Sequence, residues 1–189
     1  MKSITYWVRR VSTIPILVIV VILFAGFVGY VLPQHQAAAE KYAGAAKPPD
    51  LSFLSRPEGI YAAAEAYGEE GRHHYIVSKF TVDAAWPFVF TLLFLVSINL
   101  SFRYVHGERI AAWSVLALVT LVLDYLENVL GAVVMGLYPD RIGVLTWSLS
   151  VTTTLKWISM TVIGLMFCYG VAAVFGCLIY RGIKKIDRI

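Results

Sequence analysis

Three ionisable residues and one amide lie inside two long apolar stretches of the sequence. Asp124, Glu127 and Asn128 follow one another at spacings of three and four, so a helix places them on one face. Lys156 lies in the next apolar stretch. Charged side chains are costly in hydrocarbon and usually mark a buried pair, a proton site or a ligand site.

The depth of these residues predicts which of them meet. Asp124 is about 20 Å along a helix from either end of its stretch, and Lys156 is about 18 Å from the start of its own. The connection between the two stretches is short, so their helices are predicted to be antiparallel neighbours. We therefore expect Lys156 to face Glu127 or Asp124.

Charge balance makes this group a candidate site. Two carboxylates against one lysine leave one negative charge in excess, and two such acids do not both ionise easily. A proton, a cation from above such as Arg72 or Lys79, or a cationic ligand could balance the excess. The alternative is structural, because polar residues also hold membrane helices together.

Two sets of site residues follow. Glu127, Asp124 and Lys156 are the candidate catalytic residues, with one acid acting as general acid or base. The candidate ligand-binding residues are Asn128, Arg72, Asp83 and Thr152.

The composition predicts the elements that position these residues. Of 189 residues, 59% are hydrophobic and 15% charged, and the mean hydropathy is +0.72. This excludes a disordered chain, and two cysteines do not make a disulfide scaffold. A span needs about 20 apolar residues. We expect a single integral membrane domain of the all-α class, a four-helix bundle, with spans 13–32, 84–102, 110–137 and 144–180. The last stretch is long enough to tilt or protrude.

Basic residues predict the orientation. They gather before the first span, between the second and third, and after the fourth, at Lys2, Arg9, Arg10, Arg103, Arg109, Arg181, Lys184, Lys185 and Arg188. By the positive-inside rule, the protein is a multi-pass protein of the cytoplasmic membrane with both termini inside. The first stretch is too long for a typical signal peptide, so we expect an uncleaved helix.

The segment 33–83 is then a helical extracytoplasmic loop. Pro48 and Pro49 predict a break, and Ser55 and Pro57 a helix start that continues to Gly68. We expect one long helix over 70–103, with Arg72, Lys79 and Asp83 on one face and with Lys79 and Asp83 paired at a spacing of four. Its outer end is either an interfacial helix or a lid over the acidic residues.

No motif identifies a cofactor, a metal or a nucleic acid. The neighbouring His73 and His74 point about 100° apart on a helix, and no accompanying ligand spacing is present. The sequence carries no Gly-rich nucleotide loop and no basic and aromatic surface for nucleic acid.

Four short motifs carry a resemblance. They are Gly71-Arg72-x-x-Tyr75, Asp83-x-x-x-Pro87, Asp124-x-x-Glu127-Asn128 and Lys156-Trp157. Together, over about residues 65–160, they resemble small uncharacterised prokaryotic four-span membrane proteins. The resemblance implies the fold and no activity.

Three classes of function remain open from the sequence. The buried polar site fits a binding site for a small or lipid-like ligand or a proton, and an intramembrane enzyme is the first class that would use such a site. It also fits a small transport or proton-relay element. The third class is a non-catalytic subunit or assembly factor of a larger membrane complex. The expected partners are the lipid bilayer, a lipid or small molecule, and a second copy or a larger complex.

Overall fold

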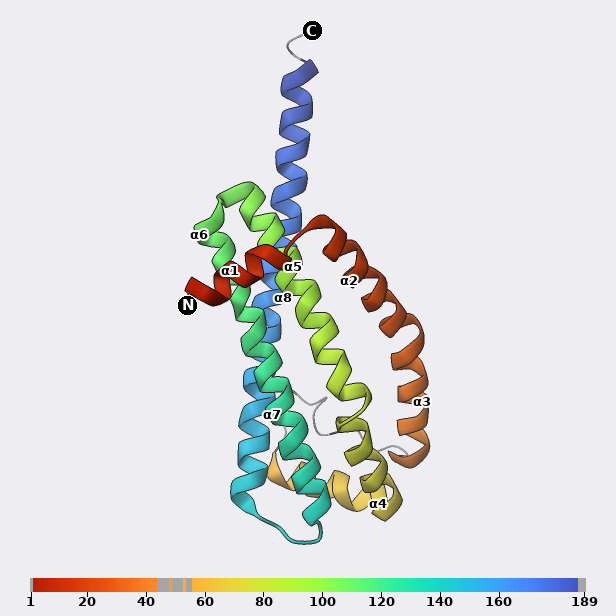
Figure 1. Cartoon of the computed structure of the whole chain (residues 1–189). Coiled ribbons are helices and arrows are strands. Elements are labelled where there is room, and N and C mark those ends of the chain that lie inside the picture. The colour runs from red at the N-terminus through yellow and green to blue at the C-terminus, as the bar shows by residue number, and fades with distance from the viewer. Residues whose placement is uncertain (1, 44–47, 49–52, 54–55, 187–189) are drawn as a thin grey trace.

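The protein is all-α and carries four helical stretches long and apolar enough to cross a membrane. The computed structural model describes residues 2–43, 48, 53 and 56–186, and these contain no strand. The four stretches are Ile14–Tyr42, Pro57–His106, Ala112–Leu137 and Gly143–Arg181. The predicted fold class is therefore confirmed (Figure 1).

The first long stretch runs further than the sequence predicts. After α1 (Lys2–Val11), α2 (Ile14–Gly26) continues through a π-helical turn (Phe27–Val31) into α3 (Leu32–Ala43). Proline normally ends a helix, because it lacks an N–H and clashes with the preceding turn. Here the wider π turn shifts the hydrogen-bond register immediately before Pro33, so the helix passes the proline and carries α3 into the segment expected to be loop.

The expected single helix over 70–103 is wrong, because the chain breaks at Phe80 and Thr81. α4 (Pro57–Lys79) ends there and α5 (Val82–His106) begins. The Thr81 hydroxyl donates to the carbonyls of Val77 and Ser78, at 2.9 and 3.3 Å, and so competes with the helical backbone. α4 begins at Pro57 as expected, while the predicted cap Ser55 lies outside the described residues.

Gly68 bends α4 rather than ending it. Its φ of 61° lies in the left-handed region that glycine adopts without strain. Helix continues on both sides of this residue. The predicted terminator is thus a kink within one helix.

The remaining helices form the antiparallel pair that carries the acidic and basic residues. α6 (Glu108–Ala111) and a 3₁₀ turn (Ala112–Val115) lead into α7 (Leu116–Leu137), and a short loop joins α7 to α8 (Gly143–Ile186). With 44 residues, α8 is about 66 Å long, against ~30 Å of hydrocarbon. Its carboxyl-terminal part extends beyond the bundle, which is one of the two alternatives that its length predicts (Figure 1).

α5, α7 and α8 form the body of the bundle, and α4 lies across one end of it, beside the loop that joins α7 to α8 (Figure 1). We call this end the α4 end and the opposite one the α6 end. α4 is held there by two buried clusters. Their residues are Ile60, Tyr61, Val134 and Leu149, and Ala64, Tyr67, Tyr75 and Met135.

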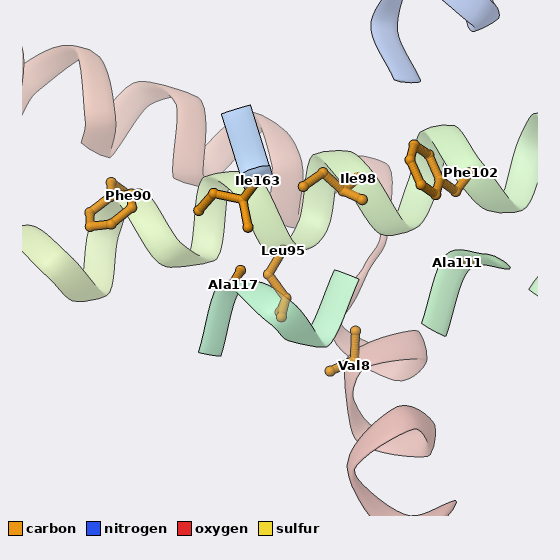
Figure 2. Packing of buried hydrophobic residues seen from close by; sticks show 8 residues of the cluster. All are labelled: Val8, Phe90, Leu95, Ile98, Phe102, Ala111, Ala117 and Ile163. Carbon is orange, nitrogen blue, oxygen red and sulfur yellow. The ribbon is translucent and has the colours of Figure 1, made fainter. Parts of the chain in front are cut away.

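The α6 end is a packed apolar core. Figure 2 shows eight buried side chains from α1, α5, α6, α7 and α8 meeting there: Val8, Phe90, Leu95, Ile98, Phe102, Ala111, Ala117 and Ile163. Asn99 is buried beside them and donates to the Ala111 carbonyl and the Ser114 hydroxyl, at 3.1 and 3.2 Å. The α6 end is therefore filled by side chains.

Candidate functional site

An ion pair joins α7 to α8 near the middle of the bundle. The Lys156 ammonium donates to Oε2 of Glu127, and the Glu127 side chain is only 1% exposed. The contact between these residues predicted from their equal depth is confirmed. Removing either partner would leave the other charge buried and unpaired, which is costly in free energy. The two residues therefore stabilise the fold only as a pair.

Asp124 is the buried charge that this pair leaves over. It lies one helical turn before Glu127 on α7 and is 8% exposed. Its carboxylate forms no hydrogen bond or ion pair with the residues that the structure describes, although the charges of Lys156 and Lys79 act on it. A carboxylate so placed calls for a proton, water or a cationic group.

A second ion pair lies at the α4 end. The Lys79 ammonium is 2.9 Å from Oδ2 of Asp83 and 4.7 Å from the centre of the Tyr75 ring. The predicted pairing of Lys79 with Asp83 is confirmed, although the break at residues 80–81 separates their helices. Lys79 is only 3% exposed, so this cation is held within the protein rather than in solvent.

Asn128 completes the backbone of α5 rather than binding a charged side chain. Pro87 has no N–H to donate to the Asp83 carbonyl one turn earlier. The Asn128 amide donates to that carbonyl instead, at 2.8 Å, and the Tyr125 hydroxyl donates to the carbonyl of Ala84 at 2.9 Å. Asn128 thus satisfies the carbonyl that the proline leaves without a donor, and Tyr125 adds a second hydrogen bond from α7 to α5.

These groups line one cavity of about 320 Å³ between α3, α4, α5, α7 and α8. Asp124, Asn128 and both ion pairs line it, with aromatic and sulfur-containing side chains from Tyr75, Trp86, Trp157 and Met160. Three carboxylates face two ammonium groups in this lining. With neutral histidines, the cavity therefore keeps the single negative excess that the sequence predicts. Its size is that of a small-molecule site.

α3 and α4 add an imidazole wall that the sequence analysis missed. His35 and His74 both line the cavity, with their ring centres 6.4 Å apart, and His74 stacks on Tyr42 at 4.6 Å. Nε2 of His35 is buried and has no hydrogen-bond partner among the described residues. Within the same residues, no group of three His, Cys, Asp or Glu side chains could hold a metal.

Arg72 and Thr152 lie outside the cavity. Arg72 donates to the Ala64 carbonyl at 3.1 Å and lies 4.8 Å from the centre of the Tyr138 ring. It shares a face of α4 with Lys79, but α4 runs across the bundle, which places the two residues about 10 Å apart along that helix. Thr152 is buried one turn before Lys156 and faces a groove between α7 and α8. Arg72 therefore does not balance Asp124.

The comparisons with known proteins add no relative. No protein-family model, no curated protein and no solved structure matches the chain. The resemblance to prokaryotic four-span proteins stays a prediction. What this protein does must therefore be inferred from the cavity and from the charges that line it.

Proposed function

We propose that this is a multi-pass membrane protein whose cavity binds a small cationic ligand, with an amine or ammonium group held by Asp124. The observation that carries this proposal is the Asp124 carboxylate, buried on the cavity wall without a hydrogen bond or an ion pair to any residue that the structure describes. A bound cation forms the ion pair that neither buried lysine forms with this residue, because Lys79 pairs with Asp83 and Lys156 with Glu127.

The rest of the lining supports an organic cation. Trp86 and Trp157 border the cavity, and aromatic faces attract ammonium groups when water is excluded. Leu32, Pro87 and Met160 offer apolar surface for the remainder of the ligand. A proton would also neutralise Asp124, and it is the second candidate, but a proton needs neither the volume nor the aromatic walls.

The packing supports binding rather than passage through the protein. The eight-residue core of Figure 2 fills the α6 end. The cavity instead lies toward α3 and α4. A ligand therefore enters and leaves on the α4 side.

We place the α4 end on the outer side of the cytoplasmic membrane, because the basic residues gather at the other end. Single cysteines test this in a background in which Cys168 and Cys177 are replaced by serine. In intact cells, an impermeant maleimide should label Glu69→Cys and not Glu108→Cys. The reverse pattern would overturn the orientation and leave the ligand proposal intact.

Calorimetric titration of the purified protein in detergent tests the ligand. n-Hexylamine is the probe, n-hexanoate is the matched anion, and protein-free micelles give the blank. Hexylamine should bind and hexanoate should not. Asp124→Asn should weaken hexylamine binding about 10- to 100-fold, the range for a hydrogen bond to a charged group.

Asp140→Asn is the matched control, since it removes the same charge from the exposed loop between α7 and α8. It should leave binding unchanged. Equal affinity in wild type and Asp124→Asn would overturn the assignment. Proton uptake on folding that is lost in Asp124→Asn, without any amine binding, would favour the proton instead.

A further inference from the structure

His35 offers the cavity a second ligand contact on a different element from Asp124. Asp124 projects from α7, whereas His35 belongs to α3 and lies beside His74 of α4. The His35 atom Nε2 is buried yet has no hydrogen-bond partner among the described residues. A buried polar atom without a partner costs about 1–3 kcal/mol unless a ligand or water satisfies it.

We infer that the ligand carries a neutral oxygen as well as its amine, so that it is an amino alcohol or an amino ether. The inference builds on the proposed function and deepens it. The amine contacts Asp124, and the oxygen exchanges a hydrogen bond with Nε2 of His35. An imidazole nitrogen can donate or accept, so a hydroxyl satisfies it in either tautomer.

The charges of the cavity favour a neutral oxygen over an anionic one. A carboxylate or phosphate beside His35 would share the cavity with Asp83, Asp124 and Glu127. Lys79 and Lys156 already pair with two of these acids. A further anion would therefore add repulsion without gaining an unengaged cation.

A metal ion does not explain the histidines as well as a ligand oxygen does. His74 stacks its ring on Tyr42 at 4.6 Å, and the two histidine rings lie nearly parallel, at an interplanar angle of 28°. No third metal-binding side chain joins them within the part of the chain that the structure describes.

A length series of ω-amino alcohols, from three to eight carbons, tests the inference in the wild-type protein. Each is compared by calorimetry with the n-alkylamine of equal chain length. At the length that spans Asp124 and His35, the hydroxyl should tighten binding roughly 3- to 10-fold, the range of one net hydrogen bond. No gain at any length would overturn this inference. If the alkylamines do not bind at all, the proposed function itself fails.

Variants of His35 test whether this residue causes the tighter binding of the ω-amino alcohols. His35→Phe keeps an aromatic ring against His74 but cannot hydrogen-bond, so alkylamine affinity should persist while the hydroxyl gain disappears. His35→Gln, with an amide that donates and accepts, should recover part of the gain. If His35→Phe does not fold, His35→Leu, which cannot hydrogen-bond either, takes its place. His106→Phe is the matched control, because His106 pairs with Tyr169 outside the cavity, Nε2 to hydroxyl at 2.8 Å.

Two outcomes would contradict the assignment. A hydroxyl gain that survives in His35→Phe would show that another residue receives the oxygen. A larger gain for ω-amino carboxylates than for ω-amino alcohols would show that this wall takes an anion.

Discussion

The two ends of the bundle bury different kinds of side chain. At the α6 end, eight apolar residues from five elements pack together, and the buried amide of Asn99 beside them donates to nearby oxygens. Between the middle of the bundle and the α4 end, two ion pairs and a further carboxylate surround a cavity of about 320 Å³. Apolar packing and ionic chemistry are thus separated along one set of helices.

This separation indicates which residues contribute only to stability and which contribute to ligand binding as well. A side chain that only packs can be removed from the α6 end without changing the charges of the cavity. A charge removed from the α4 end changes both stability and ligand affinity, because its partner remains buried. Substitutions that affect one property and not the other therefore test the comparison directly.

Replacement of Lys156 should have the largest effect on stability. Lys156→Met leaves Glu127 buried without its ammonium partner, and breaking such a pair costs about 3–5 kcal/mol. The double variant Lys156→Met/Glu127→Gln should lose less than the sum of the single losses. Equilibrium unfolding in mixed detergent micelles measures this coupling.

The matched control makes the same change on the same helix. Lys184 is exposed on the protruding part of α8, so Lys184→Met should alter stability by no more than about 0.5 kcal/mol. Additive losses at Lys156 and Glu127 would show that the pair contributes nothing to stability.

Truncation at the α6 end should lower stability without affecting the ligand. Ile98 is fully buried in the core of Figure 2, and Ile98→Ala should cost about 2–5 kcal/mol through lost transfer energy and a new void. The dissociation constant for hexylamine should stay within about twofold of wild type, because no cavity residue changes. A large loss of affinity would mean that the two ends do not act separately.

Loss of the Asn128 amide should have an intermediate effect that a second substitution reverses. Asn128→Leu leaves the Asp83 carbonyl without a donor at the proline, which costs about 1–3 kcal/mol. Pro87→Ala restores the backbone N–H that this carbonyl lacks. The double variant should therefore be more stable than Asn128→Leu alone, and unfolding in micelles measures the two stabilities. A double variant less stable than Asn128→Leu would indicate that Asn128 serves only the cavity.

The exposed ion pair at the α6 end should have the smallest effect. Nη2 of Arg9 is 2.8 Å from Oε1 of Glu108, and the two side chains are 59% and 57% exposed. Arg9→Ala should cost less than ~1 kcal/mol, and added salt should reduce the difference, because water already screens the pair. If Arg9→Ala cost as much stability as Lys156→Met, burial would not explain the difference between the two ion pairs.

The fold and the central ion pair follow from the sequence, because both depend on quantities that the sequence states directly. Apolar length sets the spans, and counting residues from the span ends places Glu127 level with Lys156. The pairing of Lys79 with Asp83 follows from their spacing of four. None of these predictions requires knowledge of how a helix is oriented within the bundle.

The features that the sequence did not predict depend on the direction in which a helix runs after a break or a π turn. Arg72 was placed above the acids because residues 70–103 were read as one helix, whereas the break at Phe80 and Thr81 turns α4 across the bundle. His35 was missed because the first span was predicted to end at residue 32, before Pro33. A turn of π-helix is not encoded by any short motif, so its effect could not be foreseen.

The role of Asn128 left a readable signal. Asp83 precedes Pro87 by four residues, the spacing at which a proline deprives a carbonyl of its donor. The spacing of Asp83 and Pro87 was used only as one of the four motifs that resemble prokaryotic four-span proteins. Considered physically, it predicts that a donor from another helix lies beside Asp83.

The filled α6 end also has an electrical consequence. With the proposed orientation, the cavity opens toward the outside and the packed apolar layer lies between Asp124 and the inner side, so that part of the membrane voltage falls on each side of Asp124. Moving one charge across the whole voltage amounts to about 2.3 kcal/mol per 100 mV. A cation that stops at Asp124 crosses part of that field, so an inside-negative potential tightens its binding, and an energised cell loads the cavity more fully than a depolarised one.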